Sequence, residues 1–263
     1  MSSEVVYRAH GQGTPVVLLH AFPLHAGMWA HVAEDLAADH LAITVDQRGF
    51  GESADVRLPE DPSLDVCADD VAGVLDELGE SGAVLVGVSM GGYVAMAFAR
   101  QYPHRVRGLV LADTKVAADT AAAAAKRLEI AERVLADRDI AGLAASMLPG
   151  LLGATTHAER PEVVKETLRI LTEASPEAVA WAQRAMAARS DSTAALNRPD
   201  ARGLVVRGDE DALMSVEDAE GVARALRHVC GSPVAIAGAG HLPPLERPRQ
   251  FAGAVRQLTQ PVT

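Results

Sequence analysis

Short apolar segments alternate along the chain with segments of helical length. Each apolar segment is rich in β-branched residues and ends at a small or polar residue; the segments are 16–19, 41–45, 83–88, 109–112, 204–206 and 234–237. Strands that crossover helices bury on both faces have this character. The helical segments are 28–38, 66–78, 90–101, 216–228 and 245–258. This order predicts an α/β protein with a mostly parallel sheet covered by helices on both faces, and residues 4–8 as an antiparallel edge strand.

Residues 115–200 interrupt this alternation because they contain no convincing strand. Their Ala-rich sequence predicts helices near 120–137, 139–148, 160–173 and 176–188, with Pro161 and Pro176 close to helix starts, where proline is tolerated. We therefore expect a core of residues 1–114 and 201–263 and a helical cap of residues 115–200. Ligands of open α/β sheets bind at the carboxyl ends of the strands, which the cap is expected to cover. A structural buttress elsewhere on the sheet is the alternative.

Composition narrows the class of protein. Hydrophobic residues make up 49% of the 263 residues and charged residues 22%, which is ordinary for a globular chain and excludes disorder. The formal net charge of −11 disfavours nucleic acid and anionic membranes as partners. The chain has only two cysteines, no leader-like N-terminus and no apolar run near the roughly 18 residues of a membrane span, so we expect a cytoplasmic protein.

The segment Gly87-Val88-Ser89-Met90-Gly91 is the most informative motif. It fits the pattern G-x-S-x-G and lies where a predicted buried strand meets a predicted helix. Such a turn holds the serine in a strained conformation with its hydroxyl exposed above the sheet, and the helix N-terminus favours developing negative charge. The motif predicts Ser89 as a nucleophile; an idle serine in a Gly-rich turn is the alternative.

A serine hydroxyl needs a base, and that base needs a third group to orient it. His241 is the candidate base, because it follows the last predicted strand and lies downstream of Ser89. The orienting carboxylate is expected between these two residues in the chain. Asp211 is the candidate, Asp209 is the fallback, and Asp113 is an outside possibility.

An oxyanion hole is expected from two backbone N–H groups, those of Phe22 and Met90. Phe22 follows the first buried strand, and Met90 follows the proposed nucleophile. His20, at the end of that first strand, is interpreted as a residue that shapes the loop rather than one that takes part in the chemistry.

The chain resembles an α/β-hydrolase, and is most similar to small bacterial serine esterases and the 3-oxoadipate enol-lactonase-like group. The matching segments follow the family's order: His20-Ala21-Phe22-Pro23-Leu24, Asp46 to Ser53, the Ser89 elbow, Gly208 to Asp211, and Gly240 to Glu246. The resemblance supports Asp211 as the acid and implies structural roles for Asp46 and Arg48. Ala21 stands where family members usually have glycine, and Met214-Ser215 stands where many have Thr-Pro.

The resemblance and the motifs together predict a cofactor-free serine hydrolase that cleaves a carboxylic ester or lactone through an acyl-enzyme, with no metal. Amide or carbon–carbon bond hydrolysis on the same triad is an alternative, and a non-catalytic ligand-binding protein with this fold is another. Family members that act on epoxides use an aspartate where this chain has Ser89. The substrate is expected to have an apolar part, because the cap carries apolar candidates for the pocket: Met147, Leu148, Leu151, Leu152, Trp181 and Met186. Helix packing is the alternative role for these residues.

Overall fold

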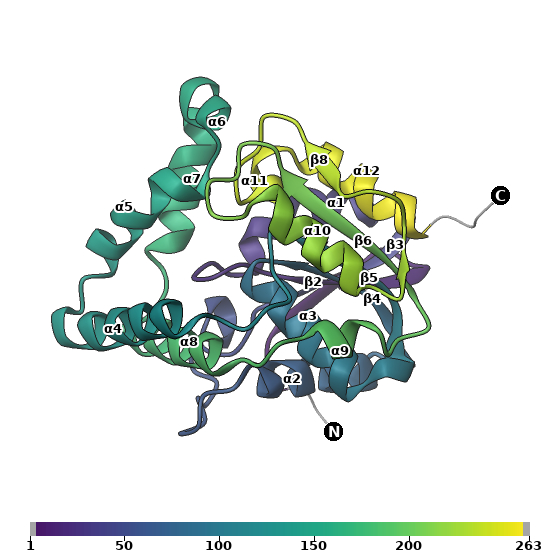
Figure 1. Cartoon of the computed structure of the whole chain (residues 1–263), viewed down its shortest axis with the longest axis horizontal. Helices are drawn as coiled ribbons and strands as arrows, with labels where there is room; N and C mark the ends of the chain where they lie inside the picture. Colours follow the sequence, from purple (N-terminus) through teal and green to yellow (C-terminus); the bar gives the residue numbers. More distant parts are fainter. Residues whose placement is uncertain (1–3, 260–263) are drawn as a thin grey trace.

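The computed structural model describes residues 4–259 and contains one eight-stranded sheet (Figure 1). The strands of this part of the chain lie in the order β1-β3-β2-β4-β5-β6-β7, and β8 also pairs with β6. Among the strands within residues 4–259, β1 alone is antiparallel to its neighbour. The bounds are β1 Tyr7–His10, β2 Thr14–Leu19, β3 His40–Val45, β4 Ala83–Val88, β5 Val106–Ala112, β6 Arg202–Gly208, β7 His228–Val229 and β8 Val234–Ile236. The predicted mostly parallel sheet is confirmed.

Helices cover both faces of the sheet, which explains why its strands are apolar throughout. Alternate residues of β4 point to opposite faces: Leu85 packs with α2 (Leu64–Glu77) and α3 (Met90–Gln101), whereas Val86 packs with α1 (Ala30–Leu36) and α12 (Pro248–Thr259). All six residues of β4 are buried. Helix α10 (Val216–Ala225) packs on the α2–α3 face. A strand buried on both sides has no polar face to present, so apolar-polar alternation is absent.

Several element boundaries differ from those expected, each for a local reason. The edge strand begins at Tyr7 because Val6 bonds instead to Ser53 Oγ and to the Asp46 N–H. The C-terminal helix is divided into α11 (Pro243–Glu246) and α12, since Pro248 disfavours a helical conformation at Arg247. The helix expected over 216–228 ends at Ala225, and the last expected residue, His228, begins the short strand β7. The helix expected over 28–38 is a 3-10 turn, η1 (Ala26–Trp29), followed by α1.

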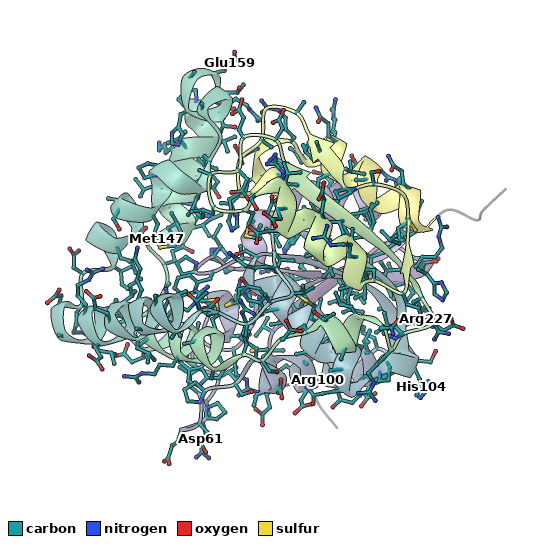
Figure 2. The ribbon with its side chains drawn as sticks, viewed as in Figure 1. Asp61, Arg100, His104, Met147, Glu159 and Arg227 are labelled. Carbon is teal, nitrogen blue, oxygen red and sulfur yellow. The ribbon has the colours of Figure 1, made fainter. Side chains whose placement is uncertain are left out.

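All secondary-structure elements between β5 and β6 are helices, and this segment projects to one side of the sheet (Figure 1). Helices α4 and α8 pack against each other, as do α5 and α7. Figure 2 labels Met147 on α5 and Glu159 near the outer tip of this segment. The bounds are α4 Ala121–Asp137, α5 Ile140–Leu151, α6 Ala154–Glu159, α7 Pro161–Leu171, α8 Pro176–Ala188 and α9 Thr193–Leu196. We refer to α4–α9 as the cap.

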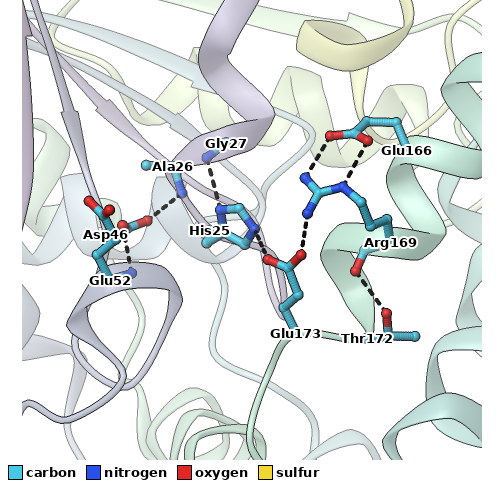
Figure 3. A network of polar contacts seen from close by, with 9 residues as sticks. All are labelled: His25, Ala26, Gly27, Asp46, Glu52, Glu166, Arg169, Thr172 and Glu173. Atoms are coloured by element: carbon cyan, nitrogen blue, oxygen red, sulfur yellow. Dashed lines mark hydrogen bonds and ion pairs between the residues drawn. The ribbon is translucent and has the colours of Figure 1, made fainter.

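A polar network fastens the cap to the loop that follows β2 (Figure 3). His25 Nδ1 accepts the Gly27 N–H, so its Nε2 carries the hydrogen and donates it to Glu173 at 2.9 Å. Glu173 also binds Arg169 of α7. On the core side, Asp46 accepts the Ala26 N–H at 2.6 Å. Through this loop, hydrogen bonds to Asp46 on one side and to Glu173 on the other connect the core to the cap.

No helix between residues 4 and 259 combines the length and the apolarity that a membrane crossing requires.

Candidate active site

Ser89 occupies the turn between β4 and α3 in a conformation that few non-glycine residues adopt. Its φ of 53° and ψ of −113° lie outside the ordinary regions, so the backbone is strained at this residue. The chain reverses from strand to helix within that one residue. Ser89 remains partly exposed, although every residue of β4 before it is buried. The turn therefore holds the hydroxyl above the carboxyl end of the sheet.

Glycines on either side of Ser89 allow the backbones to cross closely. A Cβ at Gly87 would lie 2.3 Å from the carbonyl oxygen of Gly91, and a Cβ at Gly91 would lie 2.0 Å from that of Leu19. Real Cβ atoms do not approach backbone atoms this closely, so the turn requires glycine at both positions.

His241 and Asp211 meet at the other end of the same edge of the sheet. His241 Nδ1 lies 2.8 Å from Asp211 Oδ2, and both side chains are almost fully buried. Because a carboxylate only accepts hydrogen bonds, Nδ1 carries a hydrogen, and in the neutral ring Nε2 then has a free lone pair. Asp211 Oδ1 accepts the N–H groups of Leu213 (2.7 Å) and Met214 (3.2 Å). Burial raises the pKa of Asp211, but the hydrogen bond and the charge of protonated His241, together with the hydrogen bonds of Asp113 and the Leu213 N–H, outweigh it, so the net shift is downward.

The three acidic residues after β6 have different partners. Asp209 accepts the Gly238 N–H at 2.8 Å and so shapes the turn after β8. Glu210 accepts the N–H of Thr155, in the cap, at 2.8 Å. Of the three, Asp211 alone contacts His241. The spacing in the sequence left this choice open, and the contacts distinguish the three.

Asp113 follows β5 and lies beside this pair. One carboxylate oxygen of Asp113, one of Asp211 and a ring nitrogen of His241 are all within 4.8 Å of one another. The Asp113 side chain is buried, and its Oδ1 accepts the Gly208 N–H at 3.0 Å. Burial raises the pKa of Asp113 well above its usual range, and the charge of Asp211 adds to this effect.

Backbone hydrogen bonds between neighbouring strand ends place these residues on one edge of the sheet. The carboxyl ends of β4, β5, β6 and β8 are adjacent, as their pairing requires. The connecting bonds run from Ser89 N–H to Ala112 (2.9 Å), from Asp113 N–H to Val206 (3.1 Å) and from Asp209 N–H to Ile236 (3.2 Å). Ser89 is thus one strand away from Asp113, which is itself beside His241.

The loop after β2 is shaped by a buried histidine. His20 Nε2 accepts the Gln47 N–H at 3.0 Å, and Nδ1 faces the carbonyl oxygen of Ala21 at 3.1 Å. Both ring nitrogens are therefore occupied by backbone groups, as expected for a structural residue. Burial lowers the pKa of His20 to about 4. The backbone N–H groups of Phe22 and Met90 have no hydrogen-bond acceptor within residues 4–259.

Glu246 is a further important residue that the sequence analysis did not single out. It is completely buried, and its carboxylate accepts the N–H groups of Gly153, Gly240 and, at 3.3 Å, Leu242. The first belongs to the cap and the other two flank His241. One carboxylate therefore joins the cap to the histidine loop. The signal for it was a single charged residue in the otherwise uncharged stretch 239–246.

The apolar cap residues fall into two groups. Met147 and Leu148 are half-buried on α5, and Met147 packs against the apolar clusters of both sheet faces. Trp181 is 6% exposed, and its indole N–H donates to the carbonyl oxygen of Pro59 at 2.9 Å. This contact attaches α8 to the core and is typical of a packing residue. Leu151, Leu152 and Met186 are buried.

A cavity of about 830 Å³ lies beside the loops that follow β2 and β3. It is lined by residues of β1, β3, η1 and α1 and includes His25 and Glu173, but neither Ser89 nor His241. Its size is in the range of ligand pockets. The nucleophile, base and acid candidates all lie elsewhere, so this cavity is not the site described above.

Comparisons with known proteins agree with this architecture. A thermophilic esterase from Thermogutta terrifontis superposes with a TM-score of 0.91 at 39% identity, over 96% of this chain and 92% of the other. The enol-lactonase from Burkholderia xenovorans LB400 superposes with a TM-score of 0.85 at 23% identity, over 97% and 96%, which shows the fold alone.

Characterised relatives match over shorter segments. Epoxide hydrolase B of Mycobacterium tuberculosis (strain ATCC 25618 / H37Rv) is 40% identical over 100 residues, which are 38% of this chain and 28% of that protein. A pimeloyl-[acyl-carrier protein] methyl ester esterase of Chromobacterium violaceum is 40% identical over 104 residues, 40% of this chain and 38% of that protein. The chain thus matches well under half the length of either relative.

The model of the alpha/beta hydrolase fold family matches residues 14–248, which is most of the chain. The matched region includes Ser89, the candidate acids Asp113, Asp209 and Asp211, and His241. Relatives that are hydrolases indicate that this protein is an enzyme. The chain therefore belongs to the alpha/beta hydrolase fold family.

Proposed function

We propose that this protein is a cofactor-free serine hydrolase that cleaves a carboxylic ester or a lactone. The observation that carries the proposal is the strained, partly exposed Ser89 on the same edge of the sheet as the buried His241–Asp211 pair. A strained turn that exposes a hydroxyl has a cost in stability, and such strain is concentrated at functional sites. The thermophilic esterase, at 39% identity over nearly the whole chain, supports ester substrates.

The roles of the three side chains follow from their protonation. Ser89 Oγ attacks the carbonyl carbon while His241 Nε2, which has a free lone pair, accepts the hydroxyl proton. Asp211 holds the ring in this tautomer and stabilises the imidazolium through the 2.8 Å contact at Nδ1. The protonated His241 then donates to the leaving alkoxide. A water molecule, deprotonated by His241, cleaves the acyl-enzyme in the second half of the reaction.

The negative charge on the tetrahedral intermediate needs donors that are already in place. We assign this role to the unoccupied N–H groups of Phe22 and Met90. The N-terminus of the twelve-residue helix α3 begins at Met90 and adds a favourable dipole.

Ester or lactone chemistry agrees better with the elbow residue than epoxide opening does. Family members that open epoxides use a carboxylate nucleophile, and this position carries the hydroxyl of Ser89. The match to epoxide hydrolase B covers 38% of this chain. We assign Met147 and Leu148 of the cap to the apolar part of the substrate pocket, because both are half-buried.

Ser89→Ala tests the proposal most directly. We expect the folded variant to lose about 10⁴- to 10⁶-fold in kcat on a chromogenic acyl ester, as removal of a triad serine does in other hydrolases. Asp211→Asn should lose up to about 10⁴-fold, because the histidine would be held in the wrong tautomer. The matched control is Asp209→Asn, two residues away and bound only to a turn.

Steady-state kinetics on purified, folded variants decide between the outcomes. Near-normal turnover by Ser89→Ala would overturn the serine mechanism. A larger loss in Asp209→Asn than in Asp211→Asn would move the acid to Asp209, and small losses in both would move it to Asp113.

A further inference from the structure

A second carboxyl group lies next to the Asp211–His241 pair, and the mechanism above does not use it. Asp113 is 3% exposed and comes from a different strand, β5, whereas Asp211 follows β6. One carboxyl oxygen of Asp113, one of Asp211 and one ring nitrogen of His241 lie within 4.8 Å of one another. Two ionised carboxylates at this distance in a buried site repel strongly, so one of them must be neutralised.

The hydrogen bonds around the two carboxyl groups indicate which one is neutral. Asp211 accepts from His241 and from two backbone N–H groups, all of which favour its ionised form. Asp113 accepts a single backbone N–H, from Gly208, through Oδ1. Its other oxygen, Oδ2, is buried and has no hydrogen-bond partner among residues 4–259. A buried acceptor without a donor is costly, and a proton on Oδ2 removes that cost by turning the oxygen into a donor.

We propose that Asp113 is a positioning residue of the hydrolase: its side chain stays a neutral carboxylic acid whose Oδ2 hydroxyl donates to the Asp211 carboxylate. The proposal rests on the proposed function, because it assigns Asp113 a task only if Asp211 orients His241. The charged and titratable groups that act on Asp113 are Asp211, His241 and Arg207, and the positive charge of Arg207 only partly offsets burial.

This hydrogen bond would fix both the ionised state and the orientation of the Asp211 carboxylate. A fourth donor, beside His241 and the two backbone N–H groups, keeps the carboxylate ionised and directs Oδ2 of Asp211 at the histidine, so the imidazolium proton remains on His241 during the reaction. The pKa directions agree with this division: burial raises the pKa of Asp113 and Asp211 raises it further, whereas the net shift for Asp211 is downward.

The main variant pair separates a neutral donor from a charge. Asp113→Asn replaces the acid by a permanently neutral donor that also tolerates the positive φ of 44° at this residue. We expect its kcat to stay within about threefold of the wild type at neutral pH. Asp113→Gly also accepts this backbone conformation but removes the donor, and should lower kcat roughly 10- to 100-fold with little change in KM. A large loss in Asp113→Asn would show that the ionised form is needed and would overturn the proposal.

The pH profile and the infrared spectrum supply readouts that a purely structural role would not change. The wild type should show an alkaline inflection in kcat, where Asp113 ionises beside Asp211, and Asp113→Asn should lack it. At neutral pH the wild type should show the C=O band of a buried, protonated carboxyl group. That band should disappear in Asp113→Asn and persist in the control Asp209→Asn.

The infrared band does not depend on turnover, so it tests the proton separately from the proposed function. A band that is absent from the wild type overturns the proposal even if Ser89 is the nucleophile. A band that appears only after treatment with EDTA would mean that a divalent cation neutralises the pair, which also overturns it. If the wild type shows the band but has no esterase activity, Asp113 is protonated as proposed, but its role as a positioning residue of a hydrolase is disproved.

Discussion

At the residue scale, the site depends on two histidines that do opposite things. Among residues 4–259, the ring of His241 has a partner only at Nδ1, which contacts Asp211 at 2.8 Å. His20 has both nitrogens in contact with backbone groups and is completely buried. Both residues lie at the carboxyl ends of strands, so position alone does not distinguish them. The hydrogen bonds distinguish a candidate base from a residue that holds a loop.

His20 predicts how stability depends on pH. Its pKa is about 4 in the folded protein and about 6.5 in the unfolded chain, so between these values the unfolded chain binds the extra proton. The contribution of His20 to the free energy of unfolding is therefore fully present above about pH 6.5. It is lost as the pH falls towards 4, by about 3 kcal/mol in total.

Urea unfolding at several pH values measures this contribution. The difference in unfolding free energy between the wild type and His20→Gln should shrink by about 3 kcal/mol from pH 7 to pH 4. The control is His157→Gln, at an exposed position of the cap, for which the difference should stay constant. A difference that is the same at every pH would mean that His20 titrates normally in the folded protein.

At the scale of elements, the carboxylate of Glu246 helps to join the cap to the histidine loop. Glu246 is the last residue of the short helix α11. Its carboxylate accepts the N–H of Gly153, at the start of α6, and the N–H of Gly240, before His241. The His241 N–H also donates to Leu151 at the end of α5, at 3.1 Å. The position of the candidate base is therefore coupled to the position of the cap.

Glu246→Gln should weaken this junction. A glutamine retains one acceptor oxygen, and its NH₂ group faces a backbone N–H that is left without a partner, so we expect a loss of about 1–3 kcal/mol in stability. Displacement of His241 should lower kcat by up to about 10²-fold. Thermal unfolding and ester kinetics measure the two effects.

Glu159→Gln, at the exposed tip of the cap, is the matched control and should change neither quantity (Figure 2). If Glu246→Gln lost stability but kept full kcat, the carboxylate would fasten the cap without positioning the histidine.

At the scale of the whole molecule, the cap is attached to the core at several separate places. The His25–Glu173 bond holds it beside the loop after β2, and Trp181 holds α8 to the loop at Pro59. The third attachment is Glu246. Under the proposed function, we expect this inserted segment to influence which substrates reach the carboxyl edge of the sheet.

Trp181→Ala tests whether the attachment at Pro59 is structural. The side chain is 6% exposed, so its removal should leave a cavity and cost roughly 3–5 kcal/mol of stability. Trp181→Phe should cost less, because it retains most of the packing and loses only the hydrogen bond. The preference among acyl esters of different length should be unchanged in both variants. Unchanged thermal stability together with an altered length preference would instead make Trp181 part of the pocket.

The sheet, most of the helices and the strand-to-helix turn at Ser89 could be predicted from the amino-acid sequence, because these depend on local properties. Uniform apolar strands, helical periodicity and the small residues around Ser89 act over a few neighbouring residues, so they can be read along the chain. The predicted boundaries were wrong where a residue far away in the sequence supplied a hydrogen bond. An example is the edge strand, where the Val6 N–H donates to Ser53 Oγ.

The sequence and the resemblance favoured Asp211, but the partner of each acid came from the tertiary structure. Asp209, Glu210 and Asp211 are consecutive, and their partners lie 29, 55 and 30 residues away in the chain. The neighbourhood of Asp113 and Asp211 likewise depends on the register between β5 and β6, and the role of Glu246 depends on where α6 meets the histidine loop. These contacts join residues far apart in sequence, and their energies depend on burial and on the exact partners that folding brings together.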